Sequence, residues 1–334
     1  MKAWRIYHQA PATERPMRLQ EIPRPQPLRN EVLIRITACG VCRTDLHIVE
    51  GDLPLRKTPV TPGHQVVGRI ESVGSEVSNF NLGERVGAAW LGGVCGGCRY
   101  CISGRENLCE AAQFNGWTRD GGFAEFITAR ADFVYRLPDG FDDRAAAPLL
   151  CAGIIGYRAL RQTGIENWLG ARLGIFGFGA AGHIAIQISI HRGAEVYVAT
   201  RDRGRHARLA EELGAKWVGN TFDRPPVKLD AAIIFAPAGE VVPAALASLD
   251  KGGRVVLGGI HMSAIPPLDY QLLYHERSLL SVTNNTREDG HEFLAEAASI
   301  PLRTSTEEFP LEKADEALIA VGADAIKGAA VITI

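Results

Sequence analysis

The run RLGIFGFGAAGHIAIQIS, residues 172–189, restricts the fold of this chain more than any other segment. Gly177, Gly179 and Gly182 form a G-x-G-x-x-G motif directly after an apolar strand-like run and directly before an apolar helix-like run. Such glycines permit a tight turn and let the backbone approach a pyrophosphate, which the N-terminus of the helix attracts. We predict a dinucleotide-binding turn here. A plain tight turn between a strand and a helix is the alternative that the glycines alone leave open.

The pattern around this motif predicts the domain organisation. From residue 153 to residue 284, apolar strand-like runs such as AEVYVAT, DAAIIFAP and GRVVLGG alternate with helix-length segments, as in a parallel sheet with crossover helices. Residues 1–152 instead contain short alternating runs such as EVLIRITA between Gly and Pro turns. We therefore predict an α/β protein with a β-rich domain (1–152) and a doubly wound parallel-sheet domain (153–284). Residues 285–334 should return to the first domain through a helix and closing strands.

Composition excludes several classes of function. The formal net charge of -2 provides no basic field for nucleic acid or anionic lipid. No apolar run approaches the length of about 18 residues that a membrane span requires, and the N-terminus lacks a signal core, so we expect a soluble, cytoplasmic protein without a membrane partner. Seven cysteines, an odd number in a chain with no signal peptide, favour reduced thiolates that bind metal over a disulfide framework.

The cysteines form two groups along the chain. Cys95, Cys98, Cys101 and Cys109 lie within VCGGCRYCISGRENLC, and four cysteines close the coordination sphere of a zinc ion, which predicts a structural site. The segments ACGVCRTDLHIVEGD, TPGHQVVGRIESVG and LLCAGIIGYRAL together offer a second site. Three protein ligands with an open fourth position would let a substrate oxygen bind zinc and be polarised.

These motifs resemble those of the zinc-dependent medium-chain alcohol dehydrogenases. The resemblance rests on C-x-T-D-L-H at 42–47, G-H-x-x-x-G at 63–68, the four-cysteine run at 95–109 and Cys151 before the cofactor domain, and it covers essentially the whole chain. It implies a GroES-like catalytic domain, a Rossmann cofactor domain, one catalytic and one structural zinc ion, and a homodimer or homotetramer.

The same resemblance assigns the metal ligands. It implies that Cys42, His64 and Cys151 hold the catalytic zinc ion, and that the four-cysteine run holds the structural one. Asp45 matches a carboxylate that orients the zinc-binding histidine, with a solvated turn aspartate as the alternative. Cys39 is left over, and we expect it to be a small buried apolar residue.

Residues for proton transfer and cofactor binding follow from the resemblance too. It implies that the proton leaves the site through Thr44, the cofactor ribose and a surface histidine, His47, whose ordinary pKa lies near neutral. Arg43 and Arg287 match basic residues that contact the cofactor pyrophosphate, although both fit surface arginines as well.

One position departs from the family pattern. The family usually has a glutamate directly after the histidine of G-H-E, and this chain has Gln65. Glutamine keeps an oxygen donor but removes a negative charge near the metal. We expect zinc to remain bound and the enzyme to remain active, with altered rates of ligand exchange.

The substrate is expected to be a small primary alcohol or its aldehyde. Trp90 lies five residues before Cys95, where members of the family that act on small primary alcohols carry a tryptophan in the pocket wall. Trp117 is a candidate second wall, and plain core packing is the alternative for Trp90. Other readings kept in view are a polyol or secondary-alcohol dehydrogenase, a zinc-free quinone reductase and a non-catalytic cofactor-binding protein.

The end of the second Rossmann strand bears on the choice of cofactor. NAD-binding domains usually place Asp or Glu there to bind the adenosine ribose, whereas AEVYVATRDRGR ends its strand with Thr200 and Arg201. A guanidinium pairs with a ribose 2′-phosphate, and Arg205 is placed to join it. We therefore expect NADP(H) to be preferred over NAD(H). Asp202 leaves the alternative that a carboxylate binds the ribose and Arg201 stacks on adenine.

Overall fold

The computed structural model describes the backbone of residues 1–334 and every side chain except that of Arg205, so the expected role of Arg205 lies outside the described side chains. The chain forms two compact units. Unit 1 contains Met1–Cys151, Thr286–Ala298 and Thr304–Ile334, and unit 2 contains Ala152–Asn285 and Ser299–Arg303.

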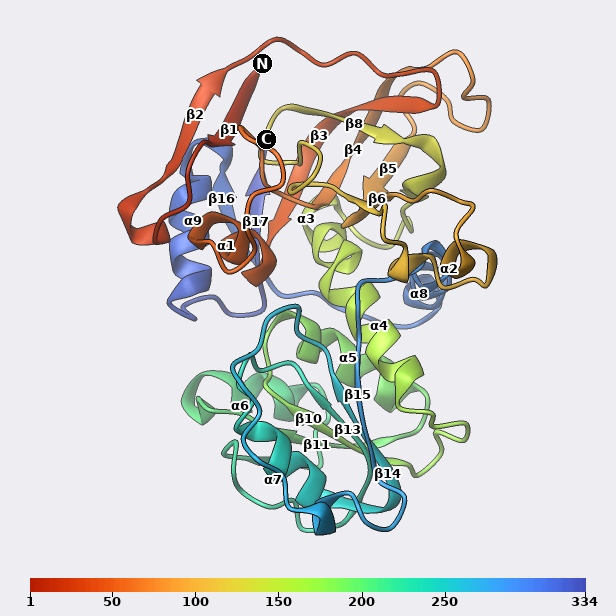
Figure 1. Cartoon of the computed structure of the whole chain (residues 1–334), viewed down its shortest axis with the longest axis vertical. Coiled ribbons are helices and arrows are strands. Elements are labelled where there is room, and N and C mark those ends of the chain that lie inside the picture. The colour runs from red at the N-terminus through yellow and green to blue at the C-terminus, as the bar shows by residue number, and fades with distance from the viewer. The chain divides into compact units, whose positions relative to one another are not determined.

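Unit 1 is built on a mixed seven-stranded sheet (Figure 1). Its central strand, β3 (Glu31–Val41), pairs antiparallel with three neighbours because its 11 residues are long enough to present edges to all of them. The sheet order is β16-β17-β3-β4-β5-β9, with β8 also paired to β3. These strands are β4 (Gln65–Val73), β5 (Arg85–Ala88), β8 (Phe126–Arg130), β9 (Val134–Arg136), β16 (Thr306–Pro310) and β17 (Ala329–Thr333).

Smaller elements of unit 1 surround this sheet. They are β1 (Lys2–Ile6), β2 (Met17–Glu21), α1 (Arg43–Glu50), β6 (Leu91–Gly93), α2 (Arg99–Ile102), β7 (Gln113–Phe114), α3 (Asp143–Ala146), α8 (Arg287–Ser299) and α9 (Ala314–Gly322), with short 3-10 turns at Ala12–Glu14, Glu106–Leu108, Ala131–Phe133, Ala147–Leu150 and Leu311–Lys313.

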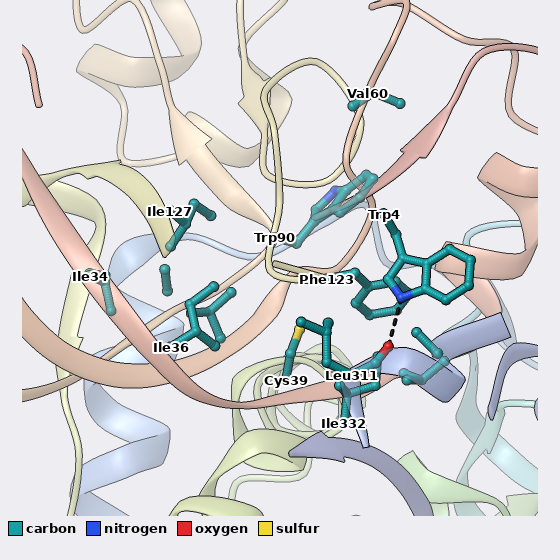
Figure 2. Close-up of a cluster of buried hydrophobic side chains, with 14 of the residues drawn as sticks. Trp4, Ile34, Ile36, Cys39, Val60, Trp90, Phe123, Ile127, Leu311 and Ile332 are labelled. Atoms are coloured by element: carbon teal, nitrogen blue, oxygen red, sulfur yellow. Dashed lines mark hydrogen bonds between the residues drawn. The ribbon is translucent and has the colours of Figure 1, made fainter. Parts of the chain in front are cut away.

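The core of unit 1 draws its side chains from distant parts of the chain. Figure 2 shows Trp4, Phe123 and Leu311 packed together, and the Trp4 indole Nε1 donates to the Leu311 carbonyl at 2.7 Å. This bond satisfies the one polar atom of a buried indole. Cys39 is fully buried in the same cluster, as expected for a small apolar side chain.

Unit 2 is a parallel six-stranded sheet with the order β12-β11-β10-β13-β14-β15. The strand order reverses at β10, whose neighbours are β11 on one side and β13 on the other, as in a doubly wound sheet. The predicted fold class is thereby confirmed. The elements are α4 (Ala152–Gln162), β10 (Arg172–Phe176), α5 (Ala180–His191), β11 (Glu195–Ala199), α6 (Arg203–Glu212), β12 (Trp217–Gly219), β13 (Leu229–Ile234), α7 (Val241–Ser248), β14 (Leu249–Leu257), a 3-10 turn at Tyr270–Leu272 and β15 (Ser278–Ser281).

The C-terminal segment is more elaborate than predicted. It contains two helices, α8 and α9, besides the strands β16 and β17. Ser299–Arg303 groups with unit 2, which differs from the single return that we expected for 285–334. The Gln187 side chain explains the difference, because its amide donates to the Arg303 carbonyl and accepts from the Arg303 N–H, both at 2.9 Å. None of the helices in the described part of the chain is long and apolar enough to cross a bilayer.

Candidate functional site

Cys42, His64 and Cys151 come together in unit 1 from three separate junctions between elements. Cys42 caps the N-terminus of α1, His64 directly precedes β4, and Cys151 ends the 3-10 turn before α4. Their ligand atoms all lie within 4.8 Å of one another, and Cys42 Sγ is 3.4 Å from His64 Nε2. Tetrahedral zinc with ordinary bond lengths separates a sulfur from a nitrogen ligand by about 3.6 Å, so the donor set and its spacing fit this metal.

The Asp45 carboxylate holds this cluster together. Its side chain is fully buried, and Oδ1 lies 2.9 Å from His64 Nδ1 while Oδ2 accepts the Cys42 N–H at 2.9 Å. Oδ1 also accepts the Gly63 N–H at 3.1 Å. A carboxylate on Nδ1 directs Nε2 to the cluster, which is the orienting contact that metal-binding histidines ordinarily have.

Burial and neighbouring groups shift the pKa values of His64 and Cys42 in opposite directions. Burial tends to lower the pKa of His64, but the charges of Asp45 and Cys42 outweigh it and raise that pKa to about 10. The pKa of Cys42 lies well below its ordinary value because the Cys151 thiol donates to it, which outweighs burial, and because His64 is close by. A lowered pKa favours the thiolate form of Cys42, which is the form that binds a metal.

The loop that carries His64 is supported by a second loop that the sequence did not reveal. The Gly121 N–H donates to Thr61 O at 2.7 Å and the Phe123 N–H donates to Pro62 O at 2.9 Å. A Cβ on Gly121 would stand 2.0 Å from the Gly63 carbonyl oxygen, so only glycine fits there. The backbone of residues 121–123 thus holds residues 61–63 in place, and the two segments lie too close together for a side chain at position 121.

An ionic cluster reinforces this contact. The Asp120 carboxylate accepts the Thr61 N–H at 2.9 Å, bonds the Arg5 guanidinium at 2.9 Å and also pairs with Lys57. Although burial raises the pKa of Asp120, bonds from Lys57 and Thr61 outweigh it and lower that pKa. Neither Asp120 nor Arg5 belongs to a sequence motif that signals a metal site, and their partners are remote in the sequence.

Gln65 lies beside the cluster at the start of β4. It is buried, and its Nε2 atom has no hydrogen-bond partner among the described residues. Its Cδ and Oε1 atoms lie 2.7 Å from where a Cβ on Gly40 would stand, so Gly40 leaves the space that this amide occupies.

Aromatic side chains extend outward from His64. The Trp90 ring meets His64 edge to face with ring centroids 5.0 Å apart, and it stacks on Trp117 at 5.8 Å. Phe114, which the sequence analysis did not identify, stacks on Trp90 at 5.0 Å. The Arg56 guanidinium lies 5.0 Å from the Trp117 ring centroid. Trp90 and Trp117 therefore belong to one aromatic cluster that begins at a candidate metal ligand.

Thr44 and His47 both lie on α1, downstream of Cys42. The expectation of a surface histidine is wrong, because His47 is 7% exposed. Its Nδ1 atom lies 2.7 Å from the Asp52 carboxylate, which is 42% exposed. Burial follows from the position of His47 on the face of α1 that packs against the unit, and Asp52 is the solvent-exposed member of the pair.

Cys95, Cys98, Cys101 and Cys109 form the second cluster. Their ligand atoms lie within 4.8 Å of one another, and three measured Sγ···Sγ distances fall between 3.6 and 3.9 Å. Tetrahedral zinc places its sulfur ligands about 3.8 Å apart, whereas a disulfide joins sulfurs at about 2 Å. Backbone N–H groups of Gly97 and Cys98 lower the pKa of Cys95 to about 6. The set fits a closed zinc site.

Arg287 pairs with Glu106, which lies in the lobe formed by residues 95–109. This pairing differs from the contact with the cofactor pyrophosphate that we expected for Arg287. Its guanidinium binds both carboxylate oxygens of Glu106, with the shortest contact at 2.6 Å, and lies 4.7 Å from the Phe133 ring centroid. The Arg287 N–H also donates to Glu106 at 2.8 Å. A bidentate pair of this kind uses the donors that a phosphate would need. Arg43 is only loosely paired, 3.7 Å from Asp324.

In unit 2 the glycine motif forms the turn between β10 and α5. Gly177 has φ +91°, and a Cβ there would stand 2.7 Å from the Ala236 N atom. Gly179 caps α5, and a Cβ on it would meet no atom within 4 Å, which leaves the space before the helix N-terminus clear. This is the cradle that a pyrophosphate requires. Gly182 packs against the Gly177 carbonyl, 3.0 Å from its would-be Cβ.

At the end of β11, Thr200 is buried and Arg201 is exposed. The Thr200 N–H donates to the Gly219 carbonyl at 3.0 Å, which fixes the strand end next to β12.

The chain matches two family models. Residues 28–139 match the alcohol dehydrogenase GroES-like domain, and residues 180–299 match the zinc-binding dehydrogenase domain. Together they cover most of the chain. The first match lies within unit 1, and the second covers most of unit 2 and continues into residues 286–298 of unit 1.

Known proteins agree with these matches. The chain is 47% identical to a probable alcohol dehydrogenase AdhA of Mycobacterium tuberculosis, over 100% of this chain and 97% of that protein. It is 37% identical to an alcohol dehydrogenase of Geobacillus stearothermophilus, over 91% and 92% of the two chains. A cinnamyl alcohol dehydrogenase structure from Sorghum bicolor superposes with a TM-score of 0.88 at 26% identity, covering 99% of this chain and 97% of that one.

Two units of this kind, one with two cysteine-rich clusters and one with a glycine turn typical of dinucleotide-binding domains, define a two-domain dehydrogenase. The chain belongs to the zinc-dependent medium-chain alcohol dehydrogenase family, and it is an oxidoreductase that acts on alcohols.

Replacing Glu106 with Gln should destabilise the protein at neutral pH by about 1–3 kcal/mol, because a charge-assisted pair to Arg287 is lost. Although burial raises the pKa of Glu106, the Arg287 bonds outweigh it and lower that pKa below 4.5. A depressed carboxylate pKa stabilises the fold above the unfolded value and loses that stabilisation as the pH falls through the folded value.

Thermal unfolding of the parent and E106Q at pH 7 and at stepwise lower pH tests this expectation. The difference in Tm should shrink once the pH falls below 4.5, the ordinary value for glutamate. A Tm difference that is absent at pH 7, or that grows on acidification, would show that the pair does not stabilise unit 1.

Proposed function

We propose that the protein reversibly oxidises primary alcohols to aldehydes by hydride transfer to a nicotinamide dinucleotide, at a zinc site formed by Cys42, His64 and Cys151. The observation that carries the proposal is the three-ligand cluster with His64 oriented by Asp45. Three ligands leave a tetrahedral metal one position for substrate. When bound, zinc supplies a Lewis acid for the substrate oxygen and the nicotinamide supplies the hydride acceptor.

In this proposal, Thr44, His47 and Asp52 transfer the proton, and Arg43 binds the cofactor. Thr44 would take the alcohol proton while giving up its own hydroxyl proton, which would pass through the cofactor ribose to His47. With Nδ1 of His47 bonded to Asp52, Nε2 is the nitrogen that receives a proton. Asp52 is more exposed than His47, so we propose that the proton reaches solvent through Asp52. Arg43 remains the proposed contact to the pyrophosphate. We also propose that the protein is cytoplasmic and assembles as a homodimer or homotetramer.

Specificity for primary alcohols rests on the aromatic cluster. Trp90 lies edge to face with His64 and is only 6% exposed, so its indole occupies space next to the metal ligands. An indole in that position excludes a second substituent on the carbinol carbon.

The function is tested with a series of ethanol, 1-butanol, benzyl alcohol, 2-butanol and sorbitol, with both nicotinamide cofactors. Primary alcohols should be the better substrates. In Trp90→Leu, the ratio of kcat/KM for 2-butanol to that for 1-butanol should rise about tenfold, since a side-chain-sized space opens beside the reacting carbon. The ratio does not depend on the active fraction of the preparation. Trp168→Leu, in unit 2, is the matched control. A parent that prefers sorbitol, or a ratio unmoved in Trp90→Leu, would refute the assignment.

Two zinc ions per chain are expected, with separable roles. Cys98→Ala should remove one ion and lower Tm, because the lobe of residues 95–109 has little apolar content and metal binding supplies its folding energy. Cys42→Ala should also remove one ion but abolish activity with a smaller loss of Tm. Cys39→Ala should retain both ions, since Cys39 is not a ligand. Metal analysis and thermal unfolding of the three variants decide this. If Cys98→Ala kept both ions and full stability, the closed site would be wrongly assigned.

We propose that NADP(H) is preferred over NAD(H). Thr200 and Arg201 at the end of β11 occupy the place where an NAD-specific domain has an acidic side chain, and Arg201 is exposed. A guanidinium attracts the ribose 2′-phosphate, and a carboxylate would repel it.

The cofactor preference is tested by kcat/KM for NADPH and NADH in the parent and in Arg201→Asp. The parent should favour NADPH, and the variant should move toward NADH by about tenfold or more, as expected for the loss of a charged pair and the gain of a repulsion. Arg224→Asp, a surface substitution of the same type in unit 2, should leave the preference unchanged. A parent that favours NADH would contradict the proposal.

A further inference from the structure

Arg56 is an exposed arginine of unit 1 that has no anionic partner among the described residues. Its Cζ atom lies over the Trp117 ring, 5.0 Å from the ring centroid, and within the described part of the chain its guanidinium makes no hydrogen bond and no ion pair. The next residue, Lys57, is paired with the Asp120 carboxylate. Arg56 is therefore the cation of this segment that is open to an anion from solution.

The contact with Trp117 holds Arg56 without using its donors. A guanidinium over an indole is held by attraction between the cation and the ring, so all five of its N–H groups remain free for hydrogen bonds. Pairs of these donors match the two oxygens of a carboxylate. The Trp117 indole N–H donates to the Pro54 carbonyl at 2.9 Å, which ties the ring to the segment that carries Arg56. Arg56 is thus positioned for an anion before any anion binds.

Arg56 ends a row of side chains that begins at the candidate metal cluster. The Trp90 ring centroid lies 5.0 Å from that of His64 and 5.8 Å from that of Trp117, and Arg56 follows over Trp117. Exposure increases along this row. His64 is fully buried and Trp90 is 6% exposed. Trp117 is half-buried and Arg56 is exposed. The row therefore leads from a candidate metal ligand to the surface of unit 1.

The two ends of the row suit different chemical groups. At the inner end Cys42 and Cys151 are both partly exposed, so a substrate oxygen can reach the cluster. Between the ends the indole rings offer apolar surface to an alkyl or aryl chain. At the outer end Arg56 suits a carboxylate. A phosphate dianion would call for a second cation, and Lys57 is already paired.

We propose that Arg56 binds the carboxylate of a substrate whose alcohol end lies at the Cys42 cluster. The enzyme would then act on hydroxycarboxylates with an apolar spacer and on the corresponding aldehyde acids. This rests on the proposed function, because it requires a site that oxidises primary alcohols. The carbinol carbon gives its hydride to the nicotinamide and the hydroxyl group loses its proton, while the carboxylate is unchanged.

The length of the spacer follows from the row. Three successive contacts separate the Arg56 guanidinium from His64. We therefore expect longer hydroxy acids to reach both ends and 4-hydroxybutanoate to fall short of Arg56.

A substrate series tests the proposal. It consists of 4-hydroxybutanoate, 6-hydroxyhexanoate, 8-hydroxyoctanoate and 10-hydroxydecanoate, each compared with the 1-alcohol of the same length. In the parent, the ratio of kcat/KM for the hydroxy acid to that for the alcohol should rise with length and favour the acid in the longer pairs. In Arg56→Gln, the ratio for 8-hydroxyoctanoate should fall about tenfold or more, because a charge-assisted contact is lost. Arg56→Lys keeps the charge without the fork of donors and should restore only part of the preference.

Arg18→Gln is the matched control. Arg18 is also an exposed arginine of unit 1 that lies over an aromatic ring, with its Cζ atom 5.9 Å from the Tyr7 ring centroid. This variant removes the same charge and should keep the parent ratio.

Octanoate, which has no hydroxyl group, provides a measurement that does not depend on turnover. Its Kd for the enzyme loaded with zinc and cofactor, measured by calorimetry, should rise in Arg56→Gln and stay at the parent value in Arg18→Gln. A parent that prefers the plain alcohol at every length, or a ratio that Arg56→Gln leaves unmoved or that Arg18→Gln lowers equally, would overturn the inference. A parent that oxidises neither the alcohols nor the hydroxy acids would instead defeat the proposed function.

Discussion

The buried carboxylate of Asp45 is the interaction on which the candidate active site depends. It bonds the backbone N–H of Cys42, the backbone N–H of Gly63 and the imidazole of His64, so one side chain joins the start of α1 to the loop before β4. A charge this deeply buried is tolerated only when its oxygens are fully bonded. Losing one of the three bonds would leave this buried charge less well compensated, so the geometry of the candidate ligands and the local fold depend on the same contacts.

The loop before β4 is held from its other side by contacts that are remote in the sequence. Arg5 bonds Asp120 and the Pro59 carbonyl, and the backbone of Gly121 packs directly on that of residues 61–63. His64, the candidate metal ligand at the end of this loop, is therefore positioned by the N-terminal strand and by the 116–123 segment together. Protein contacts alone therefore hold the loop and orient the His64 ring, without a contribution from a metal.

The grouping of Cys42, His64 and Cys151 from distant segments was predicted from the family resemblance. What the residue patterns themselves predicted correctly was local in character. The glycine turn, the parallel-sheet pattern and the four-cysteine spacing each depend on residues close together in the chain. What it missed depends on long-range contacts: Phe114 on Trp90, Asp120 below residues 61–63, and the Glu106 partner of Arg287, which is 181 residues away. Arg287 was predicted to contact a phosphate because its position resembles that of a basic residue in the family. Its sequence neighbours do not reveal that the fold places the Glu106 carboxylate against it. The burial of His47 was missed for the same reason, since α1 packs against segments far along the chain.

The two metal clusters differ in a way that follows from these contacts. All four cysteines of the 95–109 lobe come from 15 consecutive residues, so a metal bound there would close a local loop, and Arg287 ties that loop to α8 by a salt bridge. The Cys42 cluster instead draws its ligands from three junctions whose positions are set by the sheet and by the buried carboxylate of Asp45. Loss of metal should therefore unravel the lobe but leave the scaffold of the catalytic cluster in place. A site that persists without its metal can keep an open coordination position without risk to the fold, and the proposed pairing of a catalytic zinc at the Cys42 cluster with a structural zinc in the lobe rests on this difference.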